Sequence, residues 1–237
     1  MLPQIGHNPA RMRYLTPPSR FRWHLGTVLL TMAVSAVLAF LVGINLGLFL
    51  AGLLLCTVLV PYAAALWSTP RSALSAAACV TLSIAATWIW TIWVDPAVHW
   101  RGWLGACGVT IAVGLLTASL VLALLRGGLG PTSAAGLTVI LTLLWLLVPI
   151  WLFPHLQSPA LLPWMQRLID IHPVFAINSA VPLAIWPEMP LAYTLLNLNQ
   201  DVPYTMPTTL LAAILAHAAA AAILCLIRIK TSARPAP

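Results

Sequence analysis

The feature that most constrains this chain is the length of its uncharged stretches. No Asp, Glu, Lys or Arg occurs between Arg22 and Arg71, and most of that interval is apolar. Because about 20 apolar helical residues cross the ~30 Å hydrocarbon core of a bilayer, this interval is long enough for two crossings. Charged residues make up only 6% of the chain, whereas soluble proteins carry about 25%. The sequence therefore predicts an integral membrane protein without a soluble catalytic domain.

Apolar runs of this kind predict an all-α polytopic fold, with six transmembrane helices in one membrane domain at 25–229. A basic segment at 1–24 precedes this domain, and a short tail at 230–237 follows it. The expected spans are 25–43, 46–67, 73–94, 103–125, 134–153 and 208–227.

Two turns are predicted between these spans. Gly and Asn at 43–45 favour a tight turn between the first two, because both residues tolerate turn dihedrals. The glycine-rich stretch at 127–131 predicts a break before the fifth span, and Thr132 or Ser133 is a candidate N-cap for the helix that follows.

The basic residues predict the orientation of the spans. If the N-terminus is cytoplasmic, nine of the eleven Lys and Arg residues lie inside, and only Arg101 and Arg167 lie outside. This bias follows the positive-inside rule and predicts that both termini are cytoplasmic. The net charge of +7 then reflects basic residues beside lipid headgroups rather than nucleic-acid binding. The acidic residues all fall outside: Asp95, Asp170, Glu188 and Asp201.

The segment at 154–207, between the fifth and sixth spans, is predicted to lie outside and to be rich in broken helices. Its residues 160–171 predict an amphipathic helix at the membrane interface, with Arg167 and Asp170 spaced to pair. The apolar stretch at 173–186 is too short to cross and predicts a re-entrant segment shielded by protein. The expected apolar stripe of the amphipathic helix is Leu161, Met165 and Leu168, with Leu162 and Ile169 beside it.

The sequence contains no motif for nucleotide or metal chemistry, so no catalytic residue, metal or cofactor is predicted. The predicted spans carry no Asp, Glu, Lys or Arg, and His217 is the ionisable residue of note within them. Two interpretations of His217 remain open. It contacts a substrate or proton, or it is a neutral imidazole hydrogen-bonded to a neighbouring helix.

Tryptophans crowd the outer ends of the third and fourth spans. One interpretation is an aromatic belt that anchors both helices among the headgroups. The five residues are Trp88, Trp90, Trp93, Trp100 and Trp103.

The stretch from Trp90 to Trp100 resembles the tryptophan-rich, outward-facing haem-handling motif of six-span cytochrome c maturation proteins. This resemblance implies a haem-handling cytochrome-assembly factor, with His155 or His172 as further candidate ligands. The lip that it implies contains Trp90, Trp93, Asp95, His99 and His155.

The whole chain resembles the ABC-2 type transporter permease family. The likeness rests on six spans, two inner termini, a basic lead, a long outer segment of broken helices, and the Pro-containing stretch 171–178 before the last span. It implies a homo- or heterodimeric permease in a prokaryotic plasma membrane, which exports a substrate while a separate chain hydrolyses ATP.

The same resemblance implies two sets of functional residues. A contact with the ATPase subunit is expected at Thr69, Pro70, Arg71 and Arg126. A pathway or gate is expected at His172, Pro173, Asn178 and His217.

A third hypothesis is a structural or assembly membrane protein that performs no transport. Its stability would come from close helix packing at small residues, including the alanines of the sixth span and the glycines of the fourth. Those glycines are Gly105, Gly108 and Gly114.

Overall fold

The computed structural model confirms an all-α fold. Every regular element among the residues that it describes is a helix. Most of the expected spans 25–43 and 73–94 lies outside those residues, as do the segment 1–24 and the tail 230–237. The described residues are 26, 29–30, 33–34, 36–37, 44–66, 75, 78–83, 89, 100–152, 155, 158–180 and 207–226.

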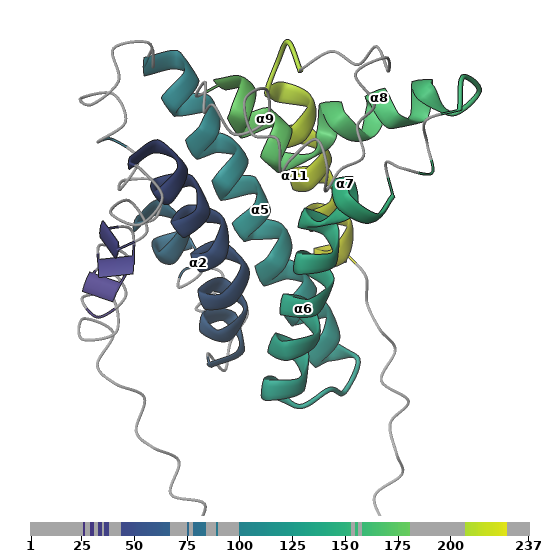
Figure 1. Cartoon of the computed structure of the whole chain (residues 1–237). Coiled ribbons are helices and arrows are strands. Elements are labelled where there is room, and N and C mark those ends of the chain that lie inside the picture. The colour runs from purple at the N-terminus through teal and green to yellow at the C-terminus, as the bar shows by residue number, and fades with distance from the viewer. Residues whose placement is uncertain are drawn as a thin grey trace, which may run out of the picture.

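Helix α5 (Trp100–Arg126) is the centre of the bundle. Its 27 residues contain no proline, and at 1.5 Å per residue the helix is about 40 Å long. Within the described residues it is the one helix long and apolar enough to cross a membrane. Helices α2 (Ile44–Leu66) and α11 (Leu211–Leu226) both pack against it, and Figure 1 shows them on opposite sides of α5.

Small residues allow α11 and its neighbours to approach α5 closely. A Cβ atom at Gly105 would meet the side chain of Leu210, and one at Gly108 would meet Ile214. Gly114 lies against Thr81 in the same way. The three glycines predicted to be packing positions therefore do lie at helix contacts.

Several threonines are buried in this bundle, while many leucines and isoleucines of its outer helices are exposed. The hydroxyls of five buried threonines each donate to a carbonyl of their own helix, and these are Thr57, Thr110, Thr117, Thr138 and Thr142. The exposed apolar side chains of α6 (Pro131–Leu146) and α11 include Leu137, Ile140, Leu141, Leu143, Leu144, Leu211, Leu215, Ile223 and Leu226. The bundle also has a buried apolar core, but this many exposed leucines and isoleucines form more apolar outer surface than a water-soluble helical protein usually has.

Helix α6 begins at Pro131, directly after the predicted glycine-rich turn, in which Gly128 has a φ of 88°. Gly130 is its N-cap and no side chain caps the helix. The prediction that Thr132 or Ser133 caps it is therefore wrong. The helix begins before both residues, at Pro131, because the fixed φ of proline suits the first helical position, where the missing N–H would have no helical acceptor.

The predicted continuous span at 134–153 is divided in two. Helix α6 ends at Leu146, and a short helix, α7 (Val148–Trp151), follows after Leu147. The break occurs because Pro149, the second residue of α7, has no N–H to donate to the carbonyl of Trp145 four residues earlier.

Two short helices, α8 (Leu162–Ile171) and α9 (Pro173–Ala180), form the described part of the outer segment. Figure 1 shows both near the end of the bundle where α5 begins. Residues 173–178 of α9 are all buried, as a shielded segment requires. The amphipathic helix is therefore present, but its apolar residues Met165 and Ile169 are buried, and α8 packs against α9 and α11.

The polar residues of α8 pair differently from the prediction. The amide of Gln166 donates to Oδ1 of Asp170 at 3.1 Å. The guanidinium of Arg167 lies over the ring of Trp164, 4.9 Å from its centroid. The structure thus has a stacked Arg–Trp pair at the position where an ion pair of Arg167 with Asp170 was expected.

We predict that Gly102→Ala destabilises the protein. A Cβ atom at this position would collide with the backbone carbonyl of Ala180, the last residue of α9. Overpacking of this kind costs about 1–3 kcal/mol, more than the ~1 kcal/mol that alanine gains in helix propensity. The measurement is thermal unfolding of the purified protein in detergent.

The matched control is Gly136→Ala, because the Cβ that it adds in α6 has nothing within 4 Å. This variant should be as stable as the parent or slightly more so. If both variants shift the unfolding temperature equally, α9 is not packed on α5 as described.

Candidate functional site

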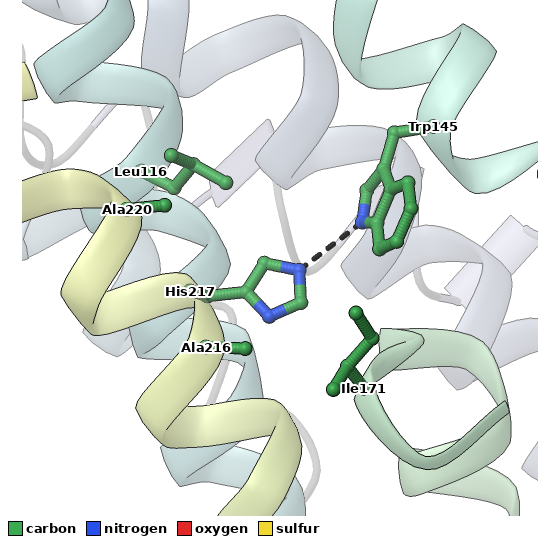
Figure 2. Close-up of a pocket in the computed structure, with 6 residues that line it drawn as sticks. All are labelled: Leu116, Trp145, Ile171, Ala216, His217 and Ala220. Atoms are coloured by element: carbon green, nitrogen blue, oxygen red, sulfur yellow. Dashed lines mark hydrogen bonds between the residues drawn. The ribbon is translucent and has the colours of Figure 1, made fainter. Parts of the chain in front are cut away.

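Trp145 connects two helices through its side chain. Its indole Nε1–H donates to Nε2 of His217 on α11, at 3.1 Å, and Figure 2 shows the two rings facing each other. Nδ1 of His217 lies 2.7 Å from the carbonyl oxygen of Ala213, one turn earlier. Because Nε2 accepts, Nδ1 carries the proton and donates to that carbonyl. His217 is thus a neutral imidazole with both nitrogens bonded.

The side chain of His172 bonds to the backbone of the same tryptophan. Nε2 of His172 is 3.0 Å from the carbonyl oxygen of Trp145, and Nδ1 accepts the backbone N–H of Val174 at 3.3 Å. The proton of this imidazole is therefore on Nε2, which donates to Trp145. His172 has extended backbone dihedrals between α8 and α9, as expected of a residue that precedes a proline, here Pro173.

Pro149 explains why the carbonyl of Trp145 lacks its usual helical donor. In an uninterrupted helix, the N–H of residue 149 would bind this oxygen, but proline has none. The Nε2–H of His172 donates to it, in addition to a backbone N–H at the C-cap of α6. A side chain from the outer segment thus bonds to the backbone at the break between α6 and α7.

The aromatic rings around Trp145 pack tightly. Its centroid is 5.1 Å from that of His172 and 6.0 Å from that of His217, and the ring of Phe175 lies edge-on to His172 at 5.6 Å. Both His172 and Phe175 are fully buried. Burial lowers the pKa of His172, which lies outside the predicted spans, from 6.5 to about 4, although its bond to the Trp145 carbonyl opposes this shift. This histidine is therefore neutral near pH 7.

A pocket of about 200 Å³ opens beside the bond between Trp145 and His217. Its wall is almost entirely apolar, and the polar atoms of the tryptophan and histidine rings are engaged with each other or with Ala213. The arrangement suits an apolar ligand and leaves no free base or donor for proton transfer. The lining residues, drawn in Figure 2, are Leu116, Trp145, Ile171, Ala216, His217 and Ala220.

The predicted pathway residues fall into two groups. His172 and His217 are brought together by Trp145, and Pro173 follows His172 as the first residue of α9. Asn178 lies further along α9, where its Oδ1 is buried without a hydrogen-bond partner.

The bonds of His217 to Trp145 and Ala213 favour the second interpretation of this residue, a neutral imidazole bonded to a neighbouring helix.

Of the predicted ATPase-contact residues, the structure describes Arg126. Its Nη1 donates to the carbonyl of Cys225 at 3.1 Å, in the last turn of α11. This bond joins the last residue of α5 to the described C-terminal part of α11. The other three residues, Thr69, Pro70 and Arg71, lie outside the described residues.

The predicted haem lip is described only at His155, which is exposed. Both ring nitrogens of His172 already have partners, so this histidine is not free to bind an iron atom. Within the described ranges, no three His, Cys, Asp or Glu residues are grouped so that they could hold a metal ion. Trp90, Trp93, Asp95 and His99 lie outside the described residues.

Trp145 is the functional candidate that the sequence analysis did not single out. It lies in a uniformly apolar run, where a tryptophan carries no periodic or charge signal. The available signal was Pro149, four residues later, which predicts an open carbonyl at residue 145. Comparison of the chain with family models, curated proteins and solved structures found no match.

We predict that Trp145→Phe lowers the free energy of unfolding by about 1 kcal/mol. The substitution keeps an aromatic ring but removes the N–H that His217 accepts, and a lost hydrogen bond costs about this much. Thermal unfolding in detergent measures the change. Trp164→Phe is the control, because Trp164 is exposed and stacks on Arg167. Equal shifts for the two variants would contradict a specific role for the Trp145 N–H.

We predict that the protein loses stability as the pH falls from about 6.5 to about 4. In this range the unfolded chain protonates His172, while the folded chain, in which its pKa is about 4, does not. Since the unfolded state binds more protons, stability falls with decreasing pH and is constant, as far as this group contributes, above pH 6.5.

His172→Asn tests this assignment, because asparagine retains a donor and an acceptor but does not titrate here. Unfolding temperatures measured from pH 7 to pH 4 should depend less on pH in this variant than in the parent. The control, His155→Asn, changes an exposed histidine and should leave the parental slope. A slope unchanged in the His172 variant would refute the assignment.

Proposed function

We propose that this chain is a six-span membrane protein with both termini in the cytoplasm, and that it is the permease subunit of an ATP-driven exporter of the ABC-2 type. The membrane part of this proposal is supported by the distribution of side chains. Threonine hydroxyls and small residues are inside the described bundle, while leucines and isoleucines are exposed on α6 and α11. Helices surrounded by hydrocarbon gain nothing by burying leucine, so close contact of small residues holds them together.

The described helices occupy four of the apolar runs from which several crossings are proposed. Helix α5 is long enough to cross, and α2 and α11 occupy two further apolar runs beside it. Helices α6 and α7 together occupy a fourth. With arginines concentrated at the ends assigned to the cytoplasm, these helices fit the proposed orientation in a prokaryotic plasma membrane.

The exporter part is supported by the outer segment. Two short helices, α8 and α9, precede the last span and meet at His172, as the resemblance to ABC-2 permeases implies. His172 binds the break between α6 and α7, and α8 also packs against α11. A change in the relative position of α6 and α11 would therefore move the outer segment, which is what a gate requires. These contacts of the outer segment with α6 and α11 are the single observation that carries the proposal.

The energy for export would come from a separate ATPase subunit. The chain has no phosphate-binding loop motif and a single lysine, Lys230, which lies in the tail. The permease would act as a dimer, with the pathway between its two halves. The expected ATPase contact is at the cytoplasmic turn that contains Thr69, Pro70 and Arg71.

We predict that affinity purification of the tagged protein from native membranes, in a mild detergent, recovers an ATPase subunit. Mass spectrometry identifies it by its phosphate-binding loop. Arg71→Glu should reduce the recovered ATPase severalfold, because this substitution reverses the charge at the proposed contact.

Arg101→Glu is the matched control, since Arg101 is placed on the outer side and should leave recovery unchanged. Recovery of no ATPase from repeated preparations would refute the exporter proposal. Equal losses in both variants would refute the proposed contact.

A further inference from the structure

The pocket beside Trp145 lies in a crevice between α6 and α11. Both helices pack against α5, and the hydrogen bond from Trp145 to His217 joins them across the space between. Leu116 of α5 forms part of the floor of the crevice, and Ile171, the last residue of α8, lies at its side. Figure 2 shows these side chains converging from four helices on one space.

The chemistry of the crevice selects an uncharged, apolar occupant. Its wall contains two polar side chains, and their ring nitrogens are already bonded within the protein. A headgroup or a polar substrate would have to enter without gaining a hydrogen bond, which is costly. An alkyl chain loses no hydrogen bond by entering, and it makes van der Waals contacts with the wall that an empty space would lack.

The size of the crevice argues for a narrow occupant. At about 200 Å³, it is smaller than the roughly 300–1,000 Å³ of pockets that hold drug-sized molecules. A segment of a single alkyl chain fits such a volume, whereas a bulky ring system does not.

The surroundings of the crevice identify the source of this chain. Leu144 directly precedes Trp145 on α6, and Leu215 directly precedes Ala216 on α11, and both leucines are exposed. Leu141 lies one turn before Trp145 and is exposed too. Ala219, which directly precedes Ala220, is also exposed. The pocket is therefore flanked by apolar outer surface on both helices, which in a membrane contacts hydrocarbon.

We propose that the crevice between α6 and α11 binds one acyl chain of a bilayer phospholipid, which enters laterally between the two helices. This inference rests on the membrane location proposed above but not on export. The acyl chain fills the space beside the Trp145–His217 bond and packs against both rings. Lipid binding would thereby support the contact between α6 and α11 at the level of that bond.

The test uses the full-length protein in nanodiscs that contain a phospholipid with a diazirine in its acyl chain. After illumination, mass spectrometry maps the labelled residues. We expect labelling at Leu116, which is half-buried on the floor of the crevice, in addition to labelling of exposed leucines. Labelling restricted to exposed positions such as Leu144 and Leu215 would overturn the proposal.

A matched pair of variants on α11 makes the test specific. Ala220→Leu fills the crevice and should abolish most labelling at Leu116, whereas Ala219→Leu adds the same atoms on the exposed face and should not. Ala216→Leu, at a second lining position, gives the same expectation if Ala220→Leu folds poorly, and thermal unfolding verifies each variant. Retention of Leu116 labelling in a folded, crevice-filled variant would overturn the proposal.

A single-chain diazirine amphiphile distinguishes the source of the chain. Labelling of Leu116 by the amphiphile but not by the phospholipid would overturn the assignment to a bilayer lipid. The outcome is separate from the export test. Loss of crevice labelling while the ATPase is recovered would refute this inference alone, and crevice labelling without an ATPase would refute the exporter alone.

Discussion

The described bundle depends on the backbone carbonyl of Trp145, which lacks its usual helical donor because residue 149 is proline. Pro149 cannot donate to the oxygen of Trp145, so helix α6 breaks, and His172 supplies a donor from the outer segment. The indole of the same tryptophan binds His217 on the last helix. Trp145 thus connects the fifth and sixth predicted spans with the segment between them. The pocket is the apolar space left beside this connection, which explains why its wall contains polar rings without free polar atoms.

The sequence predicted the helical class well because long uncharged runs permit few other structures. It also located the packing glycines of α5, since small residues within an apolar run predict close helix contacts. The sequence-based predictions were wrong where two local preferences compete for the same residue. Thr132 or Ser133 was expected to cap α6, but the helix begins earlier, at Pro131, with Gly130 as its N-cap. Arg167 was expected to pair with Asp170, but it stacks on the ring of Trp164, three residues earlier.

The candidate site was predictable only in part. His217 was identified because ionisable residues are rare in apolar segments, and His172 because of the two family resemblances, yet their common partner was not identified. A tryptophan among leucines looks like any other large apolar residue, and its significance depends on a proline in the next turn and a histidine 27 positions away. Sequence separation of this kind carries no periodic signal, so tertiary structure was needed to connect the three residues. For His217 the connection favours one of the two interpretations left open by the sequence, the neutral imidazole bonded to a neighbouring helix.

The buried threonines have a mechanical consequence. Each of the five hydroxyls bonds to a carbonyl of its own helix, so none of these hydroxyls bonds to another helix. At Thr110 the cross-helix bond is made by the backbone instead, whose carbonyl accepts the Cys56 thiol of α2 at 3.8 Å. Sliding of one helix past another would leave the threonine bonds intact and would place its cost on the few cross-helix bonds, above all those of a single indole residue.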